Sequence, residues 1–138
     1  MRFVLDSNEY IFAFGISKET TILALFEQFR SHPTRYSIHV CRSIINEVYR
    51  NTSESEFQDF FDFISKITSI DEDYTVPFEL GAKYENLGLK PGDAFIAAYA
   101  DYFKAEFLVS ENRHFLSRRS DMPFRVVSAS DCLKSLKS

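Results

Sequence analysis

Short apolar runs alternate along the chain with longer segments whose apolar residues recur every three or four positions. Such runs are typical of buried strands, and the longer segments have the spacing of helices that bury one face. The clearest helical stripe consists of Phe57, Phe60, Phe61 and Ile64, with Phe63 lying off it. The pattern predicts strands at 3–5, 36–40, 67–70, 107–110 and 124–127, and helices at 19–29, 43–49, 53–66, 77–86, 94–103 and 132–136.

Residues that favour turns and helix ends separate these segments. Pro33 ends the first predicted helix, Gly88 closes the helix at 77–86, and Pro91-Gly92-Asp93 opens the next one, where Asp93 is also a natural N-cap. Residues 6–8 indicate a turn after the first strand. The aromatic residues at 10, 12 and 14 alternate, and the pattern leaves open whether they belong to the core or to an interface.

Strands that alternate with helices indicate a mostly parallel sheet covered on both faces. We therefore predict an α/β fold, a three-layer α/β/α sandwich with a central sheet of four to five strands. The length of 138 residues fits one domain, here residues 1–138, and the sequence contains no repeat, linker or low-complexity segment.

Composition limits where the protein works and what it binds. No apolar run approaches the length of a membrane span, and Asp6 interrupts the first run too early for a signal peptide, so we expect a cytoplasmic protein. Cys41 and Cys132 are too far apart for a metal knuckle or a redox pair, and we expect reduced thiols. A net charge of -4 means that any nucleic-acid binding must use a local basic patch.

Several candidate functional residues converge on one edge of the predicted sheet. Asp6, Ser110 and Asn112 follow strands, and ligands of open parallel sheets bind outside the carboxyl ends of strands. Glu47 and Asp93 lie in helices that begin at the same edge. An all-oxygen set without His or Cys favours Mg²⁺ or Mn²⁺ over Zn²⁺, and such an ion activates water for phosphodiester hydrolysis.

Four segments, in this order and spacing, resemble the PIN domain (PilT N-terminus-like), and in particular the VapC-type toxin ribonucleases. They are VLDSN at 4–8, INEV at 45–48, GDAFIAA at 92–98 and LVSENRHF at 108–115. The resemblance spans about the whole chain. It implies a PIN-like fold and a Mg²⁺- or Mn²⁺-dependent endoribonuclease that acts on RNA. For bacterial single-domain members it also implies a homodimer and a small protein antitoxin whose segment fills the active-site groove.

The resemblance also assigns roles to individual residues. It implies that Asp6, Glu47 and Asp93 are catalytic, metal-binding acids and that Asn112 takes the place of a fourth acid. An Asn carbonyl can still bind a metal or orient a water, but it brings one negative charge fewer. Asn8, Ser110 and His114 form a second tier at the edge of the site. Arg113, Arg118, Arg119 and Arg125 are candidates for contacts with an RNA backbone, and Arg42 and Arg50 are weaker ones.

Each of these residues also has a purely structural interpretation. Asp6 alone fits a turn, Asp93 a helix cap and Glu47 a solvated helix face. Away from the site we expect a connecting turn at Asp71-Glu72-Asp73, a solvated Asp101, and structural roles for His32 and His39. Asn112 and the acidic net charge motivate a competing hypothesis, a PIN-like module that binds RNA or protein without cutting. A phosphate-transfer receiver ranks last, because the sequence lacks the paired early acids and the late Lys that such a domain needs.

Overall fold

The computed structural model describes residues 1–137; residue 138, the last of the predicted domain, lies outside them. Its strands are β1 (Arg2–Leu5), β2 (Ser37–Cys41), β3 (Thr68–Asp71), β4 (Phe107–Val109) and β5 (Arg125–Val127). The α-helices are α1 (Ser7–Phe14), α2 (Thr20–Ser31), α3 (Arg42–Arg50), α4 (Glu54–Ile67), α5 (Phe78–Asn86), α6 (Pro91–Tyr102), α7 (Arg113–Ser117) and α8 (Ala129–Lys137). Two 3-10 turns, η1 (Asp73–Thr75) and η2 (Arg119–Asp121), complete the described elements.

The strands form one parallel sheet in the order β3-β2-β1-β4-β5. The chain first builds outward from β1 to β2 and β3, and then crosses back to place β4 on the other side of β1. The direction of the connections therefore reverses between β1 and β4. In open α/β sheets a reversal of this kind opens a crevice beyond the carboxyl ends of the strands.

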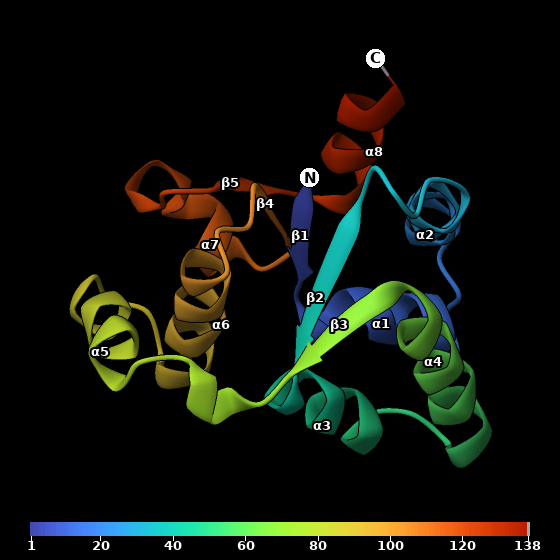
Figure 1. Ribbon diagram of the computed structural model, residues 1–138, viewed down its shortest axis with the longest axis horizontal. Coiled ribbons are helices and arrows are strands. Elements are labelled where there is room, and N and C mark those ends of the chain that lie inside the picture. The colour runs from blue at the N-terminus through green and yellow to red at the C-terminus, as the bar shows by residue number, and fades with distance from the viewer. Residues whose placement is uncertain (138) are drawn as a thin grey trace.

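Helices cover both faces of the sheet, so the predicted α/β/α sandwich is confirmed, with a sheet that is parallel throughout the described strands. Figure 1 shows α5, α6 and α7 on the left of the sheet and α1, α2 and α4 on the right. Helix α3 lies at the carboxyl end of β2, and α8 packs beside α2. Right-handed crossovers explain this division, because the two sets of connections run in opposite directions along the sheet.

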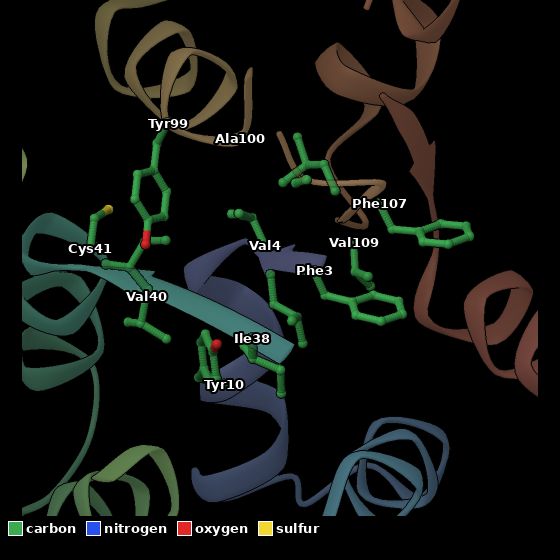
Figure 2. Close-up of a cluster of buried hydrophobic side chains, with 14 of the residues drawn as sticks. Phe3, Val4, Tyr10, Ile38, Val40, Cys41, Tyr99, Ala100, Phe107 and Val109 are labelled. Carbon is green, nitrogen blue, oxygen red and sulfur yellow. The ribbon is translucent and has the colours of Figure 1, made fainter. Parts of the chain in front are cut away.

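The core lies on both faces of the central strand. Phe3, Val4 and Leu5 of β1 are fully buried, as expected for a strand covered on two sides. Figure 2 shows Tyr99 reaching toward the sheet from α6 and Tyr10 lying on the other side of β2, where it comes from α1. Both tyrosines are fully buried, so each fixes a helix that begins at the carboxyl edge of the sheet.

Helix α1 is the main element that the sequence pattern did not predict. Asp6 is its N-cap and accepts a hydrogen bond from the Ser7 backbone N–H at 2.8 Å, so residues 7 and 8 begin a helix instead of forming a turn. Tyr10 and Phe14 are one helical turn apart and both pack against Phe60 of α4. Their alternation with Phe12 therefore reflects a helix that is covered on more than one side.

Helix α4 has the predicted stripe, with Phe60 and Ile64 fully buried. Phe63, which the pattern placed off the stripe, is also buried because it stacks on Phe26 of α2 with ring centroids 4.7 Å apart. Helix α4 thus packs against two neighbours.

Among the described residues, no helix combines the length and the apolar character that a membrane crossing requires.

The acidic segment Asp71-Glu72-Asp73 is more than the predicted connecting turn. Asp71 ends β3 and accepts a hydrogen bond from the buried Tyr99 hydroxyl at 2.6 Å. His39 lies 3.4 Å from the same carboxylate, in agreement with its predicted structural role. Asp71 therefore connects the edge strand β3 to α6 and to β2.

Candidate active site

Asp6 stands at the reversal point of the sheet, directly after β1. Its backbone N–H donates to the carbonyl of Val109 at the end of β4 at 2.9 Å, which brings the ends of these two strands together. Asp6 is only 8% exposed. A carboxylate this deeply buried requires hydrogen-bond donors or a cation.

Two serines supply donors to the Asp6 carboxylate. Ser110 donates its hydroxyl to Oδ2 at 2.9 Å, and the Ser7 backbone donates to Oδ1. Burial raises the pKa of Asp6, the hydrogen bonds from Ser110 and Ser7 oppose that rise, and the nearby charge of Asp93 adds to it. The carboxylate is therefore well positioned but incompletely compensated.

Asp93 faces Asp6 from the first turn of α6. The N-cap of this helix is Lys90 and its first residue is Pro91, so Asp93 is the third helical residue and the predicted N-cap role is wrong. The proline explains the offset, because it is favoured at the first helical position. Asp93 lies at the positive end of the helix, which stabilises its charge.

Asn112 bridges α6 and α7. Its amide nitrogen is 3.3 Å from each carboxylate oxygen of Asp93, and its carbonyl oxygen accepts the His114 backbone N–H at 2.9 Å. Its own backbone N–H donates to the Ser110 hydroxyl at 3.0 Å. In this arrangement the Asn112 amide compensates the charge of Asp93, and its carbonyl serves as the N-cap of α7.

Glu47 approaches from α3, at the opposite wall. Arg50 donates to Oε2 of Glu47 at 2.6 Å, and the side chain of Asn51 donates to Oε1 at 3.2 Å. The two side chains of the ion pair are 45% and 63% exposed, for Glu47 and Arg50 respectively. Glu47 is therefore held by its own helix and remains open to solvent.

These residues share one hollow, which we call the carboxylate cleft, with a volume of about 480 Å³. Of the predicted site residues, Asp6, Asn8, Glu47, Asp93 and Asn112 line it, whereas Ser110 is buried behind Asp6. His114 and the predicted RNA-contacting arginines are not among the lining residues. Within residues 1–137, no group of three or more His, Cys, Asp and Glu side chains is arranged to hold a metal ion.

The cleft lining also includes Ser43, Asp73 and Arg50. Sequence reasoning gave Ser43 and Asp73 no part in the site and considered Arg50 only as a weak candidate for an RNA contact. Asp73 accepts the Ser43 backbone N–H at 3.1 Å, so it caps the first turn of α3 and fixes the helix that carries Glu47. Arg50 is the one basic side chain among the lining residues. Its position three residues after Glu47 was visible in the sequence, but not the direction in which it points.

A second buried acid, Glu9, lies behind Asp6 on α1. Glu9 is 1% exposed, and within residues 1–137 its Oε1 has no hydrogen-bond partner. Burial raises the pKa of Glu9, and the neighbouring Glu111 raises it further. The signal for this residue was the spacing of Asp6 and Glu9, since an acidic residue three positions after a potential cap is typical of a helix start.

Arg118, one of the predicted RNA contacts, makes a structural contact in the described fold. It donates to the carbonyl of Leu87 at the turn between α5 and α6. Gly88 follows in that turn with a φ of +100°, and its Cα faces the Arg118 guanidinium so closely that a Cβ would lie 2.7 Å from Nη2. Arg125 is similarly occupied, because its guanidinium lies 5.0 Å from the ring centroid of Phe107.

The polar residues that we expected to be structural lie away from the cleft. His32 at the end of α2 contacts the Gln28 carbonyl at 3.1 Å through Nδ1. Asp101 is outside the site but is not simply solvated, because it accepts the Tyr84 hydroxyl at 2.7 Å. Cys41 and Cys132 are free and buried, and burial raises the pKa of both thiols, to about 11 and about 12.

Comparisons with known proteins support the fold. No protein-family model matches the sequence, and no curated protein matches it. Among solved structures, the chain resembles one chain of the crystal structure of VapBC2 from Rickettsia felis bound to a DNA fragment from their promoter, with a TM-score of 0.63 and 17% identity. The match covers 93% of this chain and 98% of that chain. The chain therefore shares the fold of that chain, and the PIN-like fold that the resemblance of the sequence implied is confirmed.

Proposed function

We propose that the protein is a metal-dependent endoribonuclease that hydrolyses RNA phosphodiester bonds. The observation that carries this proposal is the convergence of Asp6, Glu47, Asp93 and Asn112 on one cleft. These residues come from four separate segments, and the cleft lies where parallel sheets bind ligands. A purely structural interpretation of each residue gives no reason for them to meet.

The donor set of the cleft fits a hard divalent cation. All four side chains offer oxygen atoms, and the Asp6 carboxylate is buried close to the charge of Asp93, so a cation there would relieve an electrostatic cost. Asp6, Asp93 and Glu47 would hold Mg²⁺ or Mn²⁺. Such an ion, when bound, supplies an activated water and offsets negative charge on a phosphate.

The side chains around these acids have distinct roles in the proposal. Ser110 fixes the rotamer of Asp6 through its hydrogen bond, and Asn112 restrains Asp93. Arg50, the basic residue of the cleft lining, binds a phosphate of the RNA strand when Glu47 turns toward the cation. The positive charge of Arg50 offsets part of the repulsion between the acidic protein and nucleic acid.

We further propose that the protein is the toxin of a toxin–antitoxin pair and is inhibited by a small protein antitoxin. The likeness to a chain of a VapBC2 complex supports this proposal. We also propose a homodimer, on the resemblance of the sequence to bacterial single-domain PIN members. The toxin–antitoxin proposal is tested by co-expression with the product of a short reading frame that lies directly upstream. Expression of this chain alone should arrest growth, and the upstream product should relieve the arrest.

A second candidate function is a PIN-like module that binds RNA or protein without cutting. The observation that favours it is the ion pair between Glu47 and Arg50, which occupies one of the acids in the described state. Purified protein tests the two candidates on a pool of single-stranded RNA with Mg²⁺, Mn²⁺ or EDTA. Cleavage that requires the metal supports the nuclease, whereas retention of intact RNA in all three conditions supports the module.

A further inference from the structure

A second hollow lies beside the carboxylate cleft, and we call it the aromatic hollow. It has a volume of about 500 Å³, and Tyr74, Phe78, Glu85, Pro91 and Phe95 are among its lining residues. Phe95 also lines the carboxylate cleft, and Pro91 directly precedes the Gly92-Asp93 pair of that cleft. The two hollows therefore meet at the amino end of α6.

Two aromatic rings of this hollow are unusually open to solvent. Tyr74 is 85% exposed and Phe78 is 86% exposed, although most aromatic residues of this chain are packed against the core. Water-exposed rings next to an apolar hollow gain free energy when a flat, apolar surface covers them. The geometry thus favours a planar ligand that can stack.

The charge of the hollow indicates which part of an RNA strand enters it. Its one charged lining residue is Glu85, a carboxylate, which repels phosphate but accepts hydrogen bonds from N–H groups. Nucleobases combine a flat face for stacking with N–H donors at their edges. The phosphate requires the cation site and Arg50 of the adjoining cleft, so base and backbone fit the two hollows in a complementary way.

We propose that the aromatic hollow binds an unpaired nucleobase of the RNA strand whose phosphate occupies the carboxylate cleft. The inference rests on the proposed ribonuclease function. Phe78 and Tyr74 stack on the base, and Glu85 accepts from its edge. Because a paired base inside a duplex is already stacked and hydrogen-bonded, the hollow selects single-stranded RNA.

The test measures binding separately from cleavage. Fluorescence anisotropy in EDTA at low ionic strength measures the affinity of the protein for an eight-nucleotide single-stranded RNA. A second series of RNAs has one abasic site, placed at each position in turn. Phe78→Ala and Tyr74→Ala are compared with the wild type. Tyr102→Ala serves as the matched control, because Tyr102 is a partly exposed aromatic residue at the opposite end of α6.

We expect Phe78→Ala to weaken binding about tenfold, as loss of one base-stacking contact does, and Tyr102→Ala to leave it unchanged. One abasic position should weaken wild-type binding by at least a similar factor and should have a clearly smaller effect in Phe78→Ala, where only the Tyr74 and Glu85 contacts remain to be lost. If Phe78→Ala and Tyr74→Ala both bind RNA as tightly as the wild type, the proposal is overturned. This holds also if the two variants no longer associate with a protein partner. Because no cleavage enters the readout, a base site without nuclease activity, and nuclease activity without a base site, are told apart.

Discussion

The amide nitrogen of Asn112 lies 3.3 Å from both carboxylate oxygens of Asp93. A fourth acid at this position would place another negative charge next to Asp93 and close to Asp6. The amide instead donates toward Asp93 while its carbonyl caps α7. Asn112 therefore stabilises the cleft when no cation is bound, and it lowers the charge that is available to bind one.

Asn112→Asp should accordingly make the fold more dependent on metal. Without a divalent ion, repulsion from Asp93 should cost about 1 kcal/mol and lower the Tm by about 4 °C. With Mg²⁺, the extra carboxylate should produce a larger rise in Tm than the wild type shows. Thermal unfolding in EDTA and in Mg²⁺ checks both expectations, and an equal response of the two proteins to Mg²⁺ would contradict them.

Ser110→Ala removes the hydroxyl that donates to Asp6 and accepts from the Asn112 backbone. Since the Asp6 carboxylate is buried, we expect a loss of about 1–3 kcal/mol in the free energy of unfolding. Ser65→Ala is the control, because the Ser65 hydroxyl bonds to the Phe61 carbonyl on an exposed part of α4. Urea denaturation should separate the two variants, and a Ser110 effect as small as that of Ser65 would show that Asp6 does not depend on this bond.

Glu9→Gln should stabilise the protein increasingly as the pH rises. The pKa of Glu9 is raised by burial and by Glu111 above its ordinary value of 4.5. Below that pH both the folded and the unfolded chain hold the proton; above it the unfolded chain loses the proton first, so the wild-type free energy of unfolding falls. The amide removes this loss, and each pKa unit of difference contributes about 1.4 kcal/mol.

Denaturation series at pH 4.5 and pH 8 measure this effect. We expect the advantage of Glu9→Gln over the wild type to exceed about 1 kcal/mol at the higher pH and to be small at the lower one. Glu54→Gln, an exposed acid in the first turn of α4, should show no such trend. A pH-independent difference for Glu9→Gln would mean that Glu9 is ionised in the folded protein.

Arg50→Gln tests the predicted phosphate contact. Removal of one cation that binds phosphate should weaken RNA binding and lower the slope of log K against log salt by about 0.7, the value for single-stranded nucleic acid. Arg50→Lys should keep most of the slope. Arg30→Gln is a close control, because Arg30 forms the same kind of ion pair with Glu27 on the surface of α2. Equal slopes for all these proteins would remove Arg50 from the RNA-binding surface.

Much of this architecture is present in the local pattern of the sequence. The strand before Asp6 and the buried face of the helix around Phe60 could be predicted, because burial of one face leaves a periodic pattern of apolar residues in the sequence. Helix α1 was missed because Asp6-Ser7-Asn8 has the composition of a turn, while the spacing of Asp6 and Glu9, typical of a capped helix, was not used.

The finer features of the cleft depend on contacts between distant segments. Asp73 reaches the first turn of α3 only because β3 pairs with β2, and no local pattern encodes that approach. The direction of the Asn112 amide is likewise set by the N–H groups of α7 on one side and by Asp93 on the other. Arg118 was selected for its positive charge among other arginines, and no local pattern predicted its contact with the turn at Gly88.

The most direct test of the nuclease site compares two aspartates on the same helix. Asp93 lies in the carboxylate cleft, whereas Asp101 lies two turns later and contacts Tyr84. Purified wild type, Asp93→Asn, Asp6→Asn and Asp101→Asn are incubated with single-stranded RNA in Mg²⁺, Mn²⁺ or EDTA. We predict cleavage by the wild type and Asp101→Asn that EDTA abolishes, and a loss of at least about 100-fold in both cleft variants. Cleavage that persists in EDTA or in Asp93→Asn, or no cleavage by the wild type with either metal, would contradict the assignment of this cleft as a ribonuclease site.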